Sequence, residues 1–301
     1  MATGLEVSVY RAASDAAMAD QDLVAAYEAI ADVDRVMSLY RSDSELVRLN
    51  ANAGLGPVVL SAMMLDVLQA AISYARQSEG AFDVTVTPVV DLWGFYRGDR
   101  VEVPSAESIE SVRWRVGAGR VSINSAEGTA ALAPGTAIDL GAIAKGYAVD
   151  RANAALKSRG VPAAVIDLGG NIGVLGARPD GRPWRIGLQD PRYNKLMGSV
   201  SFDRGAVATS GDYDRYFEHD GRRYSHIIDP RTGWPVAGVA ATTVIAPTAM
   251  AADALSTAVF VLGAEAGLAL IAATPCAAAL VIGVDGQVTV HETTGVKFDL
   301  S

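Results

Sequence analysis

The sequence predicts an α+β protein in which helices pack against mixed or antiparallel sheets. Segments with helical spacing of apolar residues are interleaved with short alternating segments, which indicates helices placed among strands. Two Asp-Gly pairs, Asp220-Gly221 and Asp285-Gly286, stand between predicted strands and favour tight hairpin turns. No repeat and no Pro/Ser-rich linker divides the 301 residues. We therefore expect one unit over residues 1–301, made of two closely packed lobes with a cleft between them.

The first third of the chain predicts one strand and two helices. Residues 6–10 alternate like a strand, and residues 20–48 contain a helical pattern followed by a turn at residues 41–44. A second helix is expected at residues 61–77, where the Ser78-Glu79-Gly80 sequence ends it. The apolar residues at helical spacing are Leu23, Ala26, Ile30, Val33 and Met37 in the first helix, and Met64, Leu65, Val67, Leu68, Ile72 and Tyr74 in the second.

The rest of the chain is richer in predicted strands. Residues 83–98 are aromatic and loop-like, and residues 101–104 and 112–123 predict short strands and turns. A glycine-containing segment at residues 138–156 leads into a helix. Further strands are expected at residues 163–168, 184–188, 205–208, 222–228, 242–246, 278–284 and 287–291, and further helices at residues 249–262 and 264–273.

Composition excludes several classes of protein. Half of the residues are hydrophobic and a fifth are charged, which excludes a disordered chain. No uninterrupted apolar run reaches the roughly 18 residues that a membrane span needs, so no transmembrane segment is expected. The net charge of -9 argues against a nucleic-acid surface, and a phosphorylated ligand must be held locally by amides, a few cations or a divalent metal. The single cysteine, Cys276, lies among apolar residues, and we expect it to be buried.

One of the three histidines lies in the densest run of chemically active residues, Tyr224 to Gly233. This run also contains Asp229, Arg231 and two hydroxyls, and it ends in a turn signal. Such density favours a functional role for His226. A half-buried histidine beside an ordinary Asp-Pro turn explains the run equally well.

Three glycine-containing segments could approach a ligand closely. Residues 139–150 lead from a strand end through small residues into a helix, where Lys145 offers a positive charge. Gly169 and Gly170 follow a buried strand, and Thr209 and Ser210 precede another glycine. These segments suit phosphate or ribose binding, although close packing, a strand-ending turn and a shaped bend are the respective structural alternatives.

Asp253 and Thr257 are four residues apart on an apolar predicted helix, so they share one face. A carboxylate on such a face is costly unless it is paired or bound to a cation, which favours a hard divalent ion such as Mg2+. A position near the helix N-terminus, favoured by the helix dipole, is the alternative.

Taken in order, these segments resemble the ApbE family of FAD:protein FMN transferases, also called flavin transferases. Met1-Ala2-Thr3 is similar to the family's Met-Gly-Thr opening, and the resemblance extends to about Gly263. The further matching blocks are residues 37–46 with 49–50, residues 80–86 with 92–95, and the glycine-containing, histidine and Asp253 segments described above. The resemblance implies a two-lobed fold with a central FAD cleft.

The resemblance also implies a reaction. FAD is the substrate, FMN is joined by a phosphoester to a Thr or Ser hydroxyl of an acceptor flavoprotein subunit, and AMP is released with Mg2+ as cofactor. Hydrolysis of FAD to FMN and AMP, or storage of FAD without catalysis, are the alternatives that the sequence leaves open.

The resemblance assigns roles to individual residues. Asp253 and Thr257 would bind the metal together with the backbone carbonyl at Ala142, and His226 would activate the acceptor hydroxyl, so that His226 and Asp253 are the expected catalytic residues. Residues expected to bind FAD are Met1, Tyr40, Gly80, Ala81, Phe82, Asp83, Asp139, Lys145, Asp167, Gly169, Gly170, Thr209 and Ser210.

The sequence departs from the family pattern at three points. Ala2 and Ala142 stand where glycine is common, although neither change removes a proposed chemical group. The Met-Gly-Thr-like block begins at the first residue, whereas many relatives carry an export signal before it. The chain as given predicts a cytoplasmic form, and a misassigned start or an exported form lacking its signal or lipobox segment are the alternatives.

Overall fold

The computed structural model describes residues 3–96, 102–193 and 195–300. Its largest element is a seven-stranded sheet in which every neighbouring pair of strands is antiparallel. The strand order is β1 (Leu5–Tyr10), β5 (Ala163–Leu168), β6 (Asn171–Leu175), β9 (Gly205–Gly211), β14 (Val239–Ala246), β15 (Ala278–Gly283) and β16 (Val288–His291). The α+β class predicted from the sequence is confirmed.

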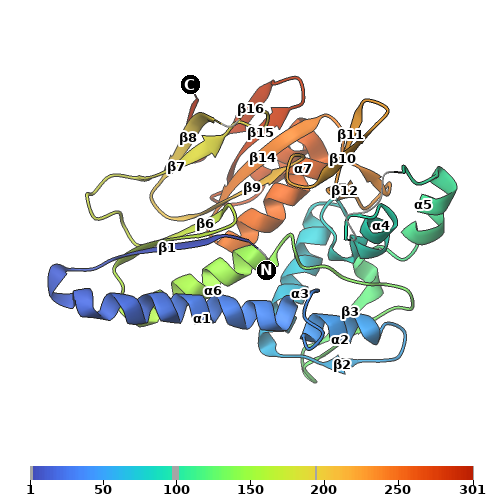
Figure 1. Ribbon diagram of the computed structural model, residues 1–301, viewed down its shortest axis with the longest axis horizontal. Helices are drawn as coiled ribbons and strands as arrows, with labels where there is room; N and C mark the ends of the chain where they lie inside the picture. The colour runs from blue at the N-terminus through green and yellow to red at the C-terminus, as the bar shows by residue number, and fades with distance from the viewer. Residues whose placement is uncertain (1–2, 97–101, 194, 301) are drawn as a thin grey trace.

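Helices cover this sheet, and two of them meet at its centre. In Figure 1, α1 (Ala19–Met37) and α6 (Ala144–Ser158) lie along each other below β1, and α7 (Ala249–Ala272) lies next to α6. The largest apolar cluster joins α1, α6 and α3 (Ala62–Gln77) to the sheet. Buried side chains such as Val33 on α1, Leu68 on α3 and Val149 on α6 contribute to it.

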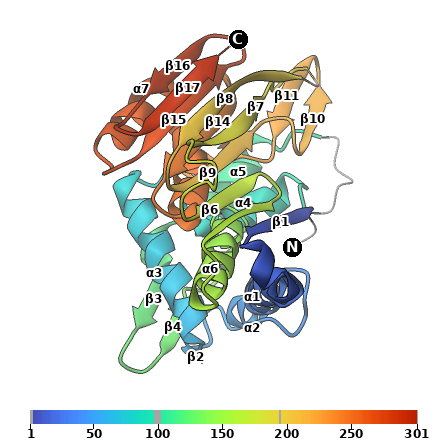
Figure 2. The same ribbon diagram turned by 90° about the vertical axis from the view of Figure 1, so that its left-hand side faces the viewer.

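Smaller elements surround this core, as Figures 1 and 2 show. The short helices are α2 (Glu45–Ala51), α4 (Thr87–Leu92) and α5 (Ala106–Arg113), with 3-10 helices at Ala13–Met18, Val84–Val86 and Ala118–Arg120. Two three-stranded sheets have the orders β2 (Val58–Val59), β4 (Thr129–Leu132), β3 (Val121–Asn124) and β17 (Val296–Leu300), β8 (Leu196–Phe202), β7 (Trp184–Gln189). Two-stranded pairs are β10 (Tyr216–His219) with β11 (Arg222–Ser225), and β12 (Ile228–Asp229) with β13 (Trp234–Pro235).

Local sequence signals explain many element boundaries. The hairpin predicted at Asp220-Gly221 joins β10 to β11, with His219 opposite Arg222. The other Asp-Gly turn closes through one backbone hydrogen bond, in which the amide of Gly283 donates to the carbonyl of Gln287. The two helices predicted at residues 249–262 and 264–273 are the two segments of α7, which meet at a break at Gly263, whose φ of 78° is not helical. Glycine is suited to this position because a side chain disfavours that φ.

Helix α7 is long and apolar enough to cross a membrane when judged by length and composition alone. Half of its most apolar window is buried inside the protein, and α7 contacts α6, β9 and β14. Gly263 interrupts it and Asp253 is buried on it. These observations are typical of a core helix.

Three local predictions are wrong. Residues 83–98 were expected to form a loop. The structure instead shows a single helical turn and α4 between residues 83 and 96, and residues 97 and 98 lie outside the described part. Pro88 lies in the first turn of α4, a helix that is too short to show a helical period. Residues 102–104 are not a strand, and residue 101 lies outside the described part; α5 follows instead, capped by Ser105, whose Oγ accepts from the amide of Ser108.

The cysteine also differs from its prediction. Cys276 is exposed in the turn after α7, with a φ of 57°. The apolar residues around it pack inward from the flanking helix and strand, and the turn itself faces solvent. Composition around a residue does not reveal which side of a turn it occupies.

Candidate active site

The centre of the candidate site is Asp253, a carboxylate with only 4% of its surface exposed. It lies in the second turn of α7, where the helix packs against the start of α6. Its Oδ1 is 3.2 Å from Lys145 Nζ, and its Oδ2 accepts from the backbone amide of Gly146 at 3.0 Å. Two predicted site residues from distant segments, Lys145 and Asp253, are therefore in direct contact.

Lys145 bridges this carboxylate and a loop carbonyl. Its ammonium group donates to the backbone oxygen of Gly141 at 2.8 Å, as well as contacting Asp253. The carbonyl and the carboxylate therefore both face one cationic group. Ala142, the residue whose carbonyl was expected to bind metal, directly follows Gly141 in the same turn.

Hydroxyl groups continue the site from α7 to β9. Ser210 Oγ lies 2.8 Å from Ser256 Oγ and 3.3 Å from Thr257 Oγ1. Ser256 Oγ also donates to the backbone oxygen of Asp253, which Thr257 Oγ1 approaches at 3.5 Å. Thr209, the other predicted residue on β9, pairs instead with Thr243 on β14 at 2.9 Å.

These oxygens suit a hard cation such as Mg2+, which binds oxygen ligands and usually takes only one or two carboxylates from the protein. Among the described residues, no group of three or more His, Cys, Asp or Glu side chains could hold a metal. A cation here would depend on Asp253 together with the Thr257 hydroxyl and a carbonyl of the 141–142 turn. Because Lys145 already contacts the same carboxylate, the position is one that favours positive charge.

Asp139 shapes the turn that carries the Gly141 carbonyl. Its Oδ1 accepts from the amide of Gly141 at 2.8 Å, and its Oδ2 accepts from the hydroxyl of Tyr96 at 2.8 Å. Burial, and then the negative charge of Asp139, raise the pKa of Tyr96 well above its usual range, so the phenol remains a hydrogen-bond donor. Tyr40, another residue predicted to bind FAD, is exposed in the turn between α1 and α2.

His226 lies on the segment between β11 and β12. Its backbone amide donates to the carbonyl of Arg215 at 2.9 Å, and its Nδ1 lies 3.2 Å from the same oxygen. Burial lowers the pKa of His226 below 6.5, and the positive charges of Arg215 and Lys145 act in the same direction. The imidazole is therefore neutral near pH 7 and able to accept a proton.

An aromatic cluster holds the His226 segment in place. Tyr224 stacks on Trp93 with ring centroids 5.5 Å apart, and Phe95 meets the His226 ring edge-to-face at 6.5 Å. The indole Nε1 of Trp93 donates to the carbonyl of Gly233, in the turn that follows His226. The residues after His226 are thus anchored by α4 and its C-terminal turn.

Two other predicted segments, residues 80–83 and residues 167–170, lie after α3 and at the end of β5 respectively. Asp83 Oδ1 accepts from both the amide and the hydroxyl of Thr85, while Ala81 and Phe82 are buried in the core. Gly80, after α3, lies beside Arg231 in the turn that follows the His226 segment.

The Asp167 segment forms the turn between β5 and β6. Asp167 Oδ1 accepts from the amide of Gly170, and Gly169 donates to the carbonyl of Gly4. Gly169 has a φ of 59°, and a side chain there would collide with Thr3. Thr3 and Gly4 therefore lie against this turn, and Met1 lies outside the described residues.

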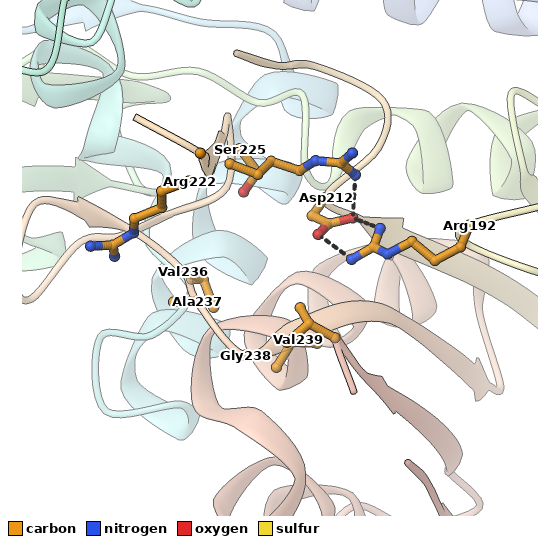
Figure 3. A pocket seen from close by; sticks show the side chains of 11 residues that line it. Arg192, Asp212, Arg222, Ser225, Val236, Ala237, Gly238 and Val239 are labelled. Carbon is orange, nitrogen blue, oxygen red and sulfur yellow. Dashed lines mark hydrogen bonds and ion pairs between the residues drawn. The ribbon is translucent and has the colours of Figure 1, made fainter. Parts of the chain in front are cut away.

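A separate cavity of about 360 Å3 lies beside the hairpin of β10 and β11. As Figure 3 shows, Arg192 and Asp212 lie next to each other in its lining, with hydrogen bonds of 2.6 and 2.7 Å between guanidinium and carboxylate. Arg223 Nη1 lies 3.7 Å from the same carboxylate. Ser225 lines the cavity, but none of the described residues that were predicted to bind FAD or metal does.

Sequence reasoning missed several residues that complete the site. Tyr96, Gly146 and Ser256 each bond directly to a predicted residue. Asp150 accepts from the first two amides of α7. Partial burial raises the pKa of the Asp150 carboxyl to about 6, and the negative charge of Asp253 adds to this effect. The spacing of Ser256, three residues after Asp253, was the only local signal for any of these contacts.

Comparison with known proteins gives consistent matches over nearly the whole chain. Residues 1–281 match the sequence model of the ApbE family. The chain is 36% identical to an FAD:protein FMN transferase of Haemophilus influenzae over 88% of this chain and 80% of that protein, and 37% identical to one of Vibrio cholerae over 90% and 82%.

Solved structures agree with the sequence matches. The ApbE protein of Thermotoga maritima superposes with a TM-score of 0.87 at 33% identity, over 96% of this chain and 94% of that one. The flavin transferase ApbE from Vibrio cholerae gives 0.85 at 33% identity, over 98% and 95%. The chain belongs to the ApbE family.

Proposed function

We propose that this chain is an FAD:protein FMN transferase that moves the FMN half of FAD onto a Thr or Ser hydroxyl of an acceptor protein. The observation that carries the proposal is the contact of the buried Asp253 with Lys145 at the start of α6. This contact lies in a chain whose relatives are named for that activity. The contact holds a carboxylate, an ammonium group and a backbone amide together in a protein whose net charge is negative.

The proposed reaction is a displacement at phosphorus. The acceptor oxygen forms a bond to the phosphorus of the FMN half, and the bond from that phosphorus to the bridging pyrophosphate oxygen breaks. AMP leaves with the bridging oxygen, and the hydroxyl proton goes to a base. Such a reaction depends mainly on positioning and on neutralising phosphate charge.

The protein's own groups supply these functions. The neutral imidazole of His226 is the proposed acceptor of the hydroxyl proton, since its lowered pKa keeps it unprotonated near pH 7. Lys145 provides a positive charge near the pyrophosphate. A bound Mg2+ would neutralise further phosphate charge, and Asp253, Thr257 and a carbonyl of the 141–142 turn are the residues that would hold it.

The direct test combines the protein with FAD, Mg2+ and an acceptor domain. We expect a covalently fluorescent acceptor whose mass increases by one FMN, located on a single Thr or Ser. AMP release at the same rate without acceptor would instead indicate FAD hydrolysis. Intact FAD after hours with metal and acceptor present would indicate a protein that only binds FAD.

A matched pair of histidine variants tests the proposed base. His226→Ala should reduce transfer about 100-fold, the usual contribution of a general base, while FAD binding changes only a few-fold. His219→Ala, at the tip of the same hairpin segment, should leave both unchanged. If FAD binding and transfer fall together in His226→Ala, the histidine has a structural role.

A further inference from the structure

We infer that Asp150 is a positioning residue, which holds the start of α7 where Asp253 can reach the N-terminus of α6. Asp150 lies on α6, and its Oδ1 and Oδ2 accept from the amides of Ala249 and Met250 at 2.8 and 2.9 Å. These are the first two amides of α7, which have no partner within their own helix.

A second carboxylate, on α7, accepts a hydrogen bond from the start of α6 in the same way. Asp253 lies on α7 and accepts from the amide of Gly146, the third residue of α6, at 3.0 Å. Each helix therefore supplies a carboxylate that caps the N-terminus of the other. We call Asp150, Asp253 and the amides that they accept from the cross-capped pair. A capping carboxylate is favourable because it satisfies unpaired amides and faces the positive end of the helix dipole.

Close packing makes this pair sensitive to small shifts. A Cβ added to Gly146 would lie 2.1 Å from the carbonyl oxygen of Ala249, so the two helices touch backbone to backbone. The Asp253 carboxylate is one turn along α7 from the amides that Asp150 accepts from. If these amides lose their partner, the first turn of α7 is no longer tied to α6, and the contacts of Asp253 with Gly146 and Lys145 weaken with it.

An ordinary helix cap on the same turn provides a matched control. Thr248 precedes α7, and its Oγ1 accepts from the amide of Ala251 at 3.2 Å. Thr248 is exposed and bonds within its own helix, so it does not tie α7 to α6. Thr248→Ala should weaken the helix start without moving Asp253 relative to α6. Asp150→Asn keeps the size of the side chain but replaces one accepting oxygen by a donor.

Hydrogen exchange tests the inference without reference to any activity. In Asp150→Asn, the amide of Gly146, which Asp150 does not contact, should exchange about tenfold faster, as expected for loss of one buried hydrogen bond. In Thr248→Ala it should exchange as in the wild type. Melting temperatures of both variants show whether a general loss of stability explains the change. Unchanged Gly146 exchange in Asp150→Asn would overturn the inference.

Metal binding and kinetics provide a second test, which rests on the proposed function. Using Mn2+ as an electron-paramagnetic probe with FAD present, Asp150→Asn should bind Mn2+ about tenfold more weakly, as expected for a residue that orients a metal ligand. Its kcat should fall more than its KM for FAD rises, and Thr248→Ala should show neither effect.

The outcomes of this test are distinguishable. A wild-type protein that neither binds Mn2+ nor transfers FMN contradicts the proposed function and leaves the exchange result standing. A wild-type protein that does both, with Asp150→Asn no worse than Thr248→Ala, contradicts the positioning role alone.

Discussion

Two buried carboxylates, Asp22 and Asp253, lie on neighbouring parts of the same helical layer and have different partners. Asp22 on α1 is completely buried and accepts from two guanidinium groups, those of Arg11 and Arg159. The Arg11 hydrogen bond is the main reason that the pKa of Asp22 lies below its usual value, since it outweighs the opposite effect of burial. Arg11 donates in addition to the backbone oxygen of Arg159, which ties the end of β1 to the end of α6.

Asp253 is nearly as buried, yet within the described part of the chain its only charged side-chain contact is one lysine at 3.2 Å, with one backbone amide at 3.0 Å. A guanidinium binds a carboxylate through a rigid planar fork, whereas an ammonium is a point charge on a flexible stem. Lys145 also keeps 27% of its side chain exposed. The partners of Asp22 are therefore typical of a structural ion pair. The partner of Asp253 is a flexible, partly exposed ammonium group, which another cation could replace. Burial alone does not separate the two roles.

The largest expected effect comes from removing the site carboxylate. Asp253→Ala should reduce FMN transfer by at least about 100-fold, the effect typical of losing one fixed group that stabilises transition-state charge. The measurement is the initial rate of covalent flavin fluorescence on the acceptor. A variant that transfers FMN as fast as the wild type would remove Asp253 from the proposed mechanism.

The structural carboxylate should give the opposite result. Asp22→Ala leaves Arg11, whose side chain is 8% exposed, without its partner, so we expect the melting temperature to fall by about 5 °C or more. Transfer per folded molecule should be unchanged at temperatures well below the transition. Loss of transfer in a fully folded Asp22→Ala protein would show that the two carboxylates are not separable.

The smallest expected effect is a pH dependence centred on His226. Because its folded pKa lies below 6.5, the unfolded chain binds more protons between the two pKa values. The stability due to this residue is thus complete above pH 6.5 and is lost as the pH falls through the folded pKa. An NMR titration of the imidazole should give a midpoint below 6.5, and His226→Gln should remove the corresponding loss of stability. A midpoint at or above 6.5 contradicts the desolvated environment described here.

Local sequence signals were sufficient to predict the elements whose conformation depends on neighbouring residues in the chain. The Asp-Gly turns, the end of α3 and the interruption at Gly263 all depend on short-range backbone chemistry, and each occurs where it was expected. The short helices α4 and α5 were missed because one or two turns are too few to show a period. Cys276 was misplaced because its exposure depends on the direction of a turn.

For the site, the sequence by itself determined which residues could act, and the resemblance to the ApbE family correctly identified the family. Asp253 and Thr257 are neighbours along one helix, so their spacing was sufficient to associate them. Their partners were decided only by the tertiary structure. Lys145 is 108 residues from Asp253, and Asp150 is 99 residues from the amide of Ala249. A sequence pattern indicates which face of a helix is apolar. The partners of the two carboxylates depend instead on how closely α6 and α7 approach each other. Gly146 allows this close approach because it has no side chain, but the contact forms only when both helices are packed.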